Sequence, residues 1–364
     1  DAIKIVKDLD GYKSLVLNQS LIMDVEKIAI GSFSPLEGFM NKEDYFSVLK
    51  DKRLKSDFVW PIPIVLPLNE SETEKFNELE EIILKDEKNN PIALFKIEEK
   101  YSRDLKEEAM SVYGTLDQQH PGVKQIYSEG RILFGGKISL IQRVNNSFSD
   151  YELTPSETRQ IFEKRSWKSI AAFHTRNVPH RAHEFIQKLS LELVDGLFIH
   201  PVIGKKKEGD FKAEVIISTY KKLIDKFYQK DKVFFSTLST YSRYAGPREA
   251  IFTALVRKNY GATHFIIGRD HTGVKEFYNK FDSHQIFSEF SEDELGITPL
   301  MFSEAYFCKK CDGMTTQKTC PHDINHHINI SGTKIRELIL NGEHIPNKVI
   351  RPEIACLLNK NSFV

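Results

Sequence analysis

The spacing of hydrophobic positions divides the chain into two parts. Residues 1 to about 150 carry short apolar runs separated by turn residues. Prolines within these runs, and Gly or Asn pairs beside them, favour irregular strands over long helices. We therefore predict a β-rich domain over residues 1–150, with strands in the runs IAIGSFSPLEGF (28–39), VWPIPIVLPL (59–68), NNPIALFKI (89–97) and RILFGGKISLI (131–141).

A helix start marks the change to the second part. Thr154 is a good N-cap, Pro155 suits the first helical position, and Glu157 stands three residues after the cap. This arrangement is a capping box, in which the cap and the glutamate satisfy each other's backbone N–H groups. We place the domain boundary near Tyr151.

After this boundary, apolar runs alternate with segments of helical spacing. Strands are expected at 170–173, 197–203, 233–238 and 263–268, and helices at about 180–193, 213–228 and 247–261. Alternation at this pitch predicts βαβ units and a parallel sheet in a Rossmann-like α/β domain. Ligands of such sheets bind at the carboxyl ends of the strands, so the residues that follow strands are the functional candidates.

The first such segment is HTRNVPHRAHEF (174–185), which has three histidines and two arginines. His180 and His183 lie three apart, so both can face one side of the predicted helix near its N-terminal end. Free N–H groups and the helix dipole favour anions there. By itself the HxxH pair is as easily accidental as functional. A zinc protease site is disfavoured because the HExxH pattern is missing.

The second segment is GRDHTG (268–273), which follows the last predicted strand. Gly268 permits close backbone approach, Arg269 and His271 can donate to phosphate, and Asp270 can accept from a nucleotide. It is not a P-loop, since a valine stands where that motif needs lysine.

Two further segments open predicted helices with cations nearby. In ISGTKIR (330–336) Ser331 caps the helix, and in SRYAGPREA (242–250) Arg243 and Arg248 flank a Gly-Pro turn. Each segment alone is ordinary. Together the four supply many hydrogen-bond donors and few nucleophiles, which suits direct transfer of a nucleotidyl group between oxygens.

Charge and composition limit the partners. Lys+Arg and Asp+Glu both total 51 in 364 residues, so we expect neither nucleic-acid nor membrane binding, and small molecules are the expected partners. No secretory signal or apolar stretch of membrane-spanning length is found, which predicts a cytoplasmic protein. Four cysteines are too few for a disulfide scaffold.

Three cysteines cluster with the spacing of a zinc knuckle. Cys308 and Cys311 form a CxxC pair, and Cys320 follows nine residues later. Structural zinc takes four N or S ligands, so we predict zinc here over free thiols. For the fourth ligand we favour His326 over His322 and His327, because His322 follows Cys320 closely.

At this point the segments resemble a known family. HTRNVPHRAHE is similar to the QTRNP-x-HRAHE signature of ATP sulfurylases, and RYAGPREA, ALVRKNYGATHFIIGRDHTG and ISGTKIR resemble its later motifs in the same order. SFSPLEGFM (32–40) looks like the family's PUA-like domain. The resemblance implies a PUA-like β-barrel over 1–150, a Rossmann-like nucleotidylyltransferase domain over 151–300, and a small C-terminal α/β segment with the zinc knuckle over 301–364.

The resemblance also implies a reaction, in which sulfate attacks the α-phosphorus of Mg²⁺-bound ATP to give adenylyl sulfate and pyrophosphate. It implies a homodimer without an adenylyl sulfate kinase domain. Arg176 would hold sulfate, and His180 and His183 would stabilise the phosphates. The catalytic set would be Thr175, Arg176, Asn177, His180 and His183, and the ligand-binding set His174, Arg176, Asn177, Gly268, Arg269, Asp270, His271, Thr272, Phe302, Arg248 and Ser331.

Three features depart from the family pattern. His174 replaces the usual Gln, Val178-Pro179 replaces Pro-x, which should leave the helix start intact, and Thr272 replaces the usual Ala. Anion preference or affinity is therefore open, and so is an adenylyltransferase with another acceptor. An RNA-binding protein built from a PUA-like domain and a zinc knuckle is a further alternative, which the neutral charge disfavours.

Overall fold

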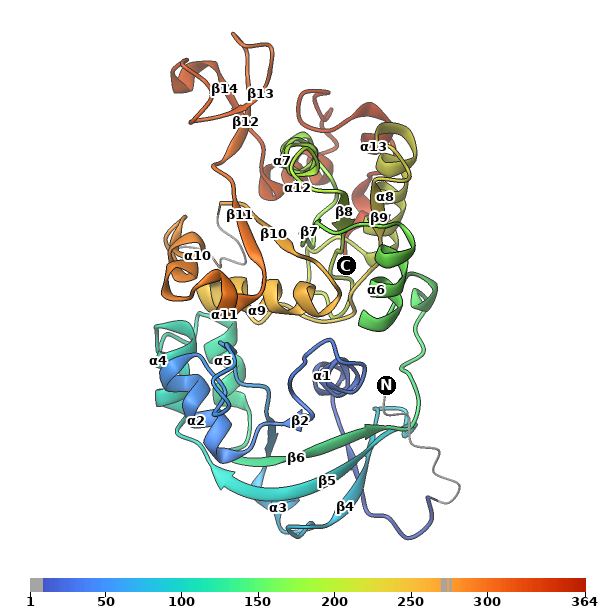
Figure 1. The fold of residues 1–364 in the computed structure, drawn as a ribbon, viewed down its shortest axis with the longest axis vertical. Helices are drawn as coiled ribbons and strands as arrows, with labels where there is room; N and C mark the ends of the chain where they lie inside the picture. The colour runs from blue at the N-terminus through green and yellow to red at the C-terminus, as the bar shows by residue number, and fades with distance from the viewer. Residues whose placement is uncertain (1–8, 270–273, 275–276) are drawn as a thin grey trace.

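The computed structural model describes residues 9–269, 274 and 277–364. Its N-terminal part is built on a curved six-stranded sheet, seen in the lower half of Figure 1. The order is β1–β4–β5–β6–β2, with β3 also on β6; β1 and β4 are parallel and the other pairs antiparallel. The strands are β1 (Ser14–Val16), β2 (Gly38–Phe39), β3 (Leu66–Leu68), β4 (Glu81–Lys85), β5 (Pro91–Ser102) and β6 (Ile132–Leu140).

The predicted β-rich domain also contains helices. They are α1 (Gln19–Ala29), α2 (Lys42–Asp51), α3 (Glu70–Thr73), α4 (Leu105–Tyr113) and α5 (Pro121–Ser128). The strand expected at 28–39 is wrong except for β2, because Ile22, Val25 and Ile28 follow helical spacing and the run begins at the end of α1. Of the run 59–68 only β3 joins the sheet, and Val59 forms a single bridge to Arg53, since the three prolines of the run lack an N–H to donate.

The second part is a parallel five-stranded sheet in the order β11–β10–β7–β8–β9. The chain starts in the middle at β7, moves outwards through β8 and β9, and then returns to add β10 and β11 on the other side. In sheets of this kind ligands bind at such a reversal, here at the carboxyl ends of β7 and β10. The strands are β7 (Ile170–Phe173), β8 (Gly196–Ile199), β9 (Val233–Phe235), β10 (His264–Ile267) and β11 (Thr298–Met301).

Helices cover both faces of this sheet. Ala172 and Phe198 join one apolar core with α6 and α9, whereas Ala171 and Leu197 join another with α7, α8 and α12. The predicted capping box is confirmed, as Glu157 N donates to Thr154 Oγ1 (3.2 Å) and Thr154 N donates to Glu157 Oε2 (2.7 Å). The helices are α6 (Pro155–Lys164), α7 (Arg181–Leu191), α8 (Ala213–Phe227), α9 (Gly246–Asn259), α10 (Asp282–Gln285), α11 (Glu292–Leu295), α12 (Gly332–Asn341) and α13 (Pro352–Ala355).

A small antiparallel sheet projects at the top of Figure 1. Its order is β13–β12–β14, and it carries the three clustered cysteines. The strands are β12 (Ala305–Cys308), β13 (Gly313–Thr316) and β14 (His327–Asn329). Short 3₁₀ turns lie at Ser149–Tyr151, Ile286–Glu289, Ile324–His326 and Lys360–Ser362.

The two main parts share one interface. A single apolar core contains residues of the N-terminal sheet and of α9. Beside it, the fully buried Lys27 on α1 pairs with Glu26 (2.7 Å) and with Glu152 (2.6 Å), which lies between the parts in sequence. A buried cation with two carboxylates fixes its neighbours in position. No helix in the described ranges is long and apolar enough to cross a bilayer.

Candidate active site

The segment after β7 forms one wall of the crevice. The carbonyl of Thr175 accepts from Val202 N (2.8 Å), and Asn177 N donates to Thr175 Oγ1 (3.1 Å), so the loop is braced against the strand beside it. Thr175 is buried, whereas Arg176 is half-buried and its guanidinium lies 5.5 Å from the ring of Tyr244. His174 and Arg176 line the same pocket.

The two HxxH histidines lie together at the start of α7, as predicted. His180 is the N-cap, and its Nδ1 accepts from His183 N (3.2 Å). The two rings stack 3.6 Å apart. Burial lowers the pKa of His180 to about 3, and burial together with His180 holds the pKa of His183 well below its usual value. Both imidazoles are therefore neutral near pH 7, and His180 carries its proton on Nε2 because Nδ1 accepts.

The segment after β10 emerges beside the first. β10 is the direct parallel neighbour of β7, so Gly268 and Arg269 leave the sheet next to the His174–Asn177 loop. Arg269 pairs with Glu304 (2.5 Å). The predicted ligands Asp270, His271 and Thr272 lie outside the described residues.

Phe302 follows β11 and is half-buried, with its N–H donating to Ile267 O (2.9 Å). Its backbone thus continues the sheet just beyond β10, at the rim where the predicted nucleotide segment begins.

The helix α12 closes the crevice from the C-terminal side. Ser331 is its N-cap, accepting from Lys334 N (3.3 Å). Arg336 Nη2 donates to Asn177 Oδ1 (2.6 Å). A Cβ added at Gly332 would lie 3.3 Å from the same Asn177 side chain, so this glycine permits the close approach. The predicted meeting of ISGTKIR with the loop after β7 is confirmed.

Sequence reasoning missed the loop after β8. Lys206 donates to Val202 O (2.7 Å) and lines the pocket with Arg176 and Asp210. Burial lowers the pKa of Lys206 to about 8, with Arg176 and Arg336 adding to the effect and Asp210 opposing it. Three cations therefore converge here. The signal was available, because GKKKEGD (204–210) follows a predicted strand.

The prediction that Arg248 binds a ligand is wrong. Its guanidinium is buried and donates to Val48 O (3.0 Å), Leu49 O (2.9 Å), Pro61 O (3.0 Å) and Ser111 Oγ (3.1 Å), all in the N-terminal part. These acceptors occupy its donors, so Arg248 fixes the interface instead. Arg243 is likewise buried and pairs with Asp24 (2.5 Å).

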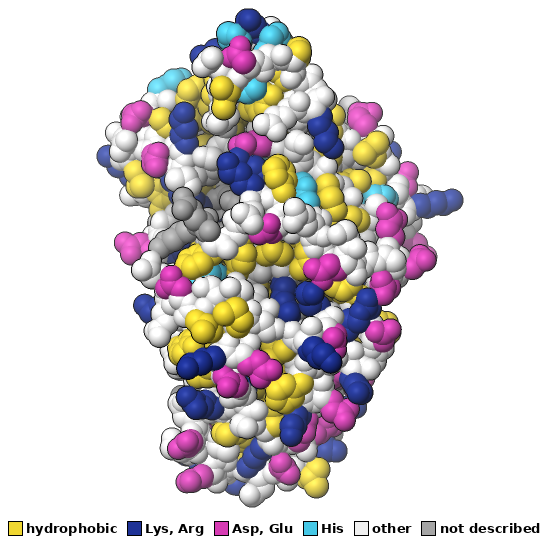
Figure 2. Space-filling model, turned by 90° about the vertical axis from the view of Figure 1, so that its left-hand side faces the viewer, with side chains coloured by type: hydrophobic (Ala, Val, Ile, Leu, Met, Phe, Trp, Pro, Cys, Tyr) yellow, Lys and Arg dark blue, Asp and Glu magenta, His cyan; other side chains and the backbone are white. Residues whose placement is uncertain are grey.

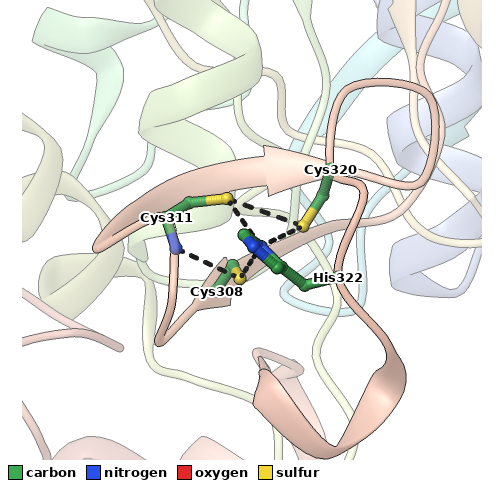
Figure 3. A group of neighbouring side chains, drawn as sticks. All are labelled: Cys308, Cys311, Cys320 and His322. Atoms are coloured by element: carbon green, nitrogen blue, oxygen red, sulfur yellow. Dashed lines mark hydrogen bonds between the residues drawn. The ribbon is translucent and has the colours of Figure 1, made fainter.

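Three thiols and one imidazole converge in the small sheet (Figure 3). The predicted Cys308, Cys311 and Cys320 are joined by His322, and the prediction of His326 as fourth member is wrong. His322 Nδ1 lies 3.4, 3.2 and 3.7 Å from the three sulfurs in that order. His326 instead faces Asp323 (3.7 Å), because the 3₁₀ turn at Ile324–His326 carries it away.

The cluster has the dimensions of a tetrahedral metal site. The four ligand atoms lie within 4.8 Å of one another, and Cys311 Sγ is 3.7 Å from Cys320 Sγ. Sulfurs held 2.3 Å from one tetrahedral ion would be about 3.8 Å apart. Burial raises the pKa of the Cys308 thiol, but the Cys311 N–H and the neighbouring thiols outweigh it and lower the pKa to about 6. A thiolate is therefore favoured at Cys308, whereas burial and the neighbouring thiols raise the pKa of Cys311 to about 11.

Surface charge does not single out another anion site on the face shown in Figure 2. Lys or Arg side chains are interspersed there with Asp or Glu, without a broad expanse of one sign. The crevice, in contrast, gathers cations from separate segments. Its cations, helix starts and neutral imidazoles can hold two anions side by side.

Comparisons with known proteins agree with this architecture. A family model described as ATP-sulfurylase matches residues 149–361, and one described as a PUA-like domain matches residues 2–143. A sulfate adenylyltransferase of Halothermothrix orenii is 45% identical over 357 residues, which is 98% of this chain and 93% of the relative. One of Pyrococcus abyssi is 46% identical over 351 residues, 96% of this chain and 91% of the relative.

Among solved structures, a hexameric APS kinase from Thiobacillus denitrificans has a TM-score of 0.74 at 19% identity. The match covers 95% of this chain but 62% of that chain, so this chain spans less than two thirds of its length. At 19% identity this similarity supports the fold alone. The relatives that match nearly the whole chain and the family model give the same result: the chain belongs to the ATP sulfurylase family.

Proposed function

We propose that the chain transfers the adenylyl group of ATP to sulfate in one direct step, as a sulfate adenylyltransferase. A sulfate oxygen forms a bond to the α-phosphorus while the bond to the bridging oxygen of the β-phosphate breaks. Pyrophosphate leaves with that electron pair, so no proton has to move and no covalent enzyme intermediate is required. The products are adenylyl sulfate and pyrophosphate, and Mg²⁺ arrives with the nucleotide as part of the substrate.

One observation carries this proposal. Arg176, Lys206 and Arg336, from three separate segments, converge at the carboxyl end of β7, where the strand order reverses. Two mutually repelling anions can approach each other only where fixed cations offset the repulsion. We assign sulfate to Arg176, and place Thr175, Asn177 and Ser331 around the sulfate and phosphates.

The neutral histidines suit the phosphates. With Nδ1 engaged by His183 N, the Nε2–H of His180 is left to donate to a phosphate oxygen. As charge moves to the departing pyrophosphate, this bond strengthens, and so does the corresponding bond from His183. We assign the nucleotide to Gly268, Arg269, Asp270, His271 and Phe302, with Thr272 beside sulfate and His174 at the pocket wall.

For the three-cysteine cluster we propose structural zinc, held by Cys308, Cys311, Cys320 and His322. Zinc prefers this donor set, and the ligand spacing suits a tetrahedral ion. Zinc would supply a cross-link in a sheet of only three short strands. Its position in β12 to β14, between β11 and α12 in sequence, supports a structural role.

The activity is tested by pyrophosphate release from ATP and Mg²⁺ on adding sulfate. We expect release to depend on sulfate, and molybdate to replace it as a tetrahedral dianion. Release that is equal with and without either anion would contradict the proposal. The homodimer, the cytoplasmic location and the division at residues 150 and 300 remain predictions, and light scattering tests the first of them.

A further inference from the structure

A buried arginine lines the pocket that also contains Arg176, the proposed sulfate ligand. Arg257, in the last turn of α9, is 1% exposed, and its Nη2 donates to His200 O (3.0 Å). Within residues 9–269, 274 and 277–364, its Nε has no hydrogen-bond partner and no carboxylate forms an ion pair with it. Burial lowers its pKa to about 9, which leaves the guanidinium charged near pH 7.

Such a charge is costly unless something compensates it. An isolated buried cation loses its hydration, and proteins normally pair it or place an anion against it. Arg248 on the same helix illustrates the ordinary solution, with acceptors for both terminal nitrogens. The two arginines are nine positions apart, about two and a half helical turns, so they face opposite sides of α9. Arg248 faces the N-terminal part and Arg257 faces the pocket.

The pocket joins Arg257 to the proposed sulfate ligand. Its lining includes Arg176, Lys205, Lys206 and Arg257, against two carboxylates, Asp210 and Glu249. Glu249 is held by backbone N–H groups, whereas Asp210 also faces the cations of the site, with its carboxylate 3.9 Å from Arg336 Nη2. Glu249 accepts from Arg243 N (2.9 Å) and Ala245 N (3.0 Å), and Asp210 accepts from Lys207 N (3.3 Å). The lining therefore has an excess of two positive charges.

The pocket wall also carries a buried hydroxyl. Thr240 is 5% exposed and lines the pocket, and its Oγ1 has no partner in the described part of the chain. A hydroxyl and a guanidinium Nε without acceptors among the described residues call for an occupant that accepts hydrogen bonds. Phe33 and Phe252, also in the lining, narrow the space around it. A compact oxyanion with two negative charges matches both the donors and the excess charge.

We infer that Arg257 and Thr240 form the inner end of the anion pocket and that Arg257 sets its preference for tetrahedral dianions over monoanions of the same shape. This inference rests on the proposed function, because Arg176 at the outer end is assigned to sulfate. Arg176 holds the anion at the reacting position, whereas Arg257 adds a fixed positive charge to the pocket wall, shielded from bulk water.

Two probes of similar shape test the charge preference: thiosulfate, a dianion, and perchlorate, a monoanion. Their inhibition constants against sulfate are measured at fixed ionic strength for wild type, Arg257→Met and Arg257→Lys. We expect the dianion preference to fall by about tenfold or more in Arg257→Met and to persist in Arg257→Lys. A folded Arg257→Met enzyme with the wild-type ratio would overturn the inference, as would a wild type without preference.

Arg248→Met is the matched control, since it removes a buried charge from the opposite face of the same helix. It is expected to lower stability without changing the ratio of the two constants. If Arg257→Met does not fold, Arg257→Gln keeps a donor for His200 O and takes its place. The thermal midpoint with each anion gives the same ratio without turnover, so failure of the charge preference is distinguished from failure of the sulfate reaction.

Discussion

The anion crevice and the cysteine sheet differ in how far apart in the sequence their site residues lie. The cysteine site takes its ligands from residues 308 to 322, within one small sheet. The crevice takes Arg176, Lys206, Arg257 and Arg336 from four segments that only the folded sheet brings together. The three cysteines of the local site can be predicted from their spacing. Which histidine joins them depends on the turn at Ile324–His326. The dispersed site depends on topology, and its chemistry is therefore sensitive to the whole domain.

The largest expected effect is at the outer end of the crevice. Arg176→Ala removes the cation assigned to sulfate, and sulfate-dependent kcat/KM should fall by about 100- to 1000-fold. Pyrophosphate release measures it. Arg131→Ala, at an exposed arginine of the N-terminal part, is the control. An Arg176→Ala enzyme as active as this control would contradict the assignment of sulfate to Arg176.

The next largest effect is expected when the fourth ligand of the cysteine site is removed. His322→Ala should lose most of its zinc to a chelator, whereas His326→Ala should retain about one zinc per chain, because only His322 reaches the three sulfurs. Metal analysis after dialysis compares the two variants. Activity should change far less than zinc content. Equal zinc retention in both variants would contradict the assignment of His322.

The interface between the two main parts contains Arg248. Substitution of this residue tests whether the interface affects stability without affecting the crevice. Arg248→Met leaves buried carbonyls of residues 48, 49 and 61 without their donor, which should lower the free energy of unfolding by about 2–4 kcal/mol. Denaturant unfolding measures this loss. The KM for sulfate should stay at the wild-type value, and a large rise in that KM would return Arg248 to the ligand set.

The smallest effect is expected at His174. His174→Gln restores the residue usual in the family, and kcat/KM for sulfate should stay within about threefold of wild type. Steady-state kinetics at saturating ATP measures it. A large loss would mean that the neighbouring residues of this chain have adapted to the imidazole.

The second part of the fold was predictable because its signals are strong and local. The capping box at Thr154 and the alternating strands and helices from 170 to 268 are confirmed, with boundaries shifted by a few residues. In the N-terminal part, α1 was missed because its apolar positions run on into the segment 28–39, which reads as one extended run. In the run 59–68 the prolines limit strand pairing more than the apolar pattern indicates.

The site was predictable where residues directly follow strands and at a capped helix. Asn177 and Arg336 meet as the motifs indicate, whereas Lys206 was overlooked in a loop of the same kind. The arginines of α9 could not be assigned from the pattern. That helix is buried on nearly all sides, so apolar spacing does not say which face meets the pocket. Only the folded interface separates Arg248 from Arg257.

Direct transfer is the central claim, and the stereochemistry at the α-phosphorus tests it most directly. The enzyme is given ATP made chiral at that phosphorus by a sulfur substituent, and the configuration of the resulting adenylyl sulfate is determined. A single in-line attack by sulfate predicts inversion of configuration. Retention would mean that a side chain first takes the adenylyl group, and would contradict the account of a crevice that holds both anions for one step.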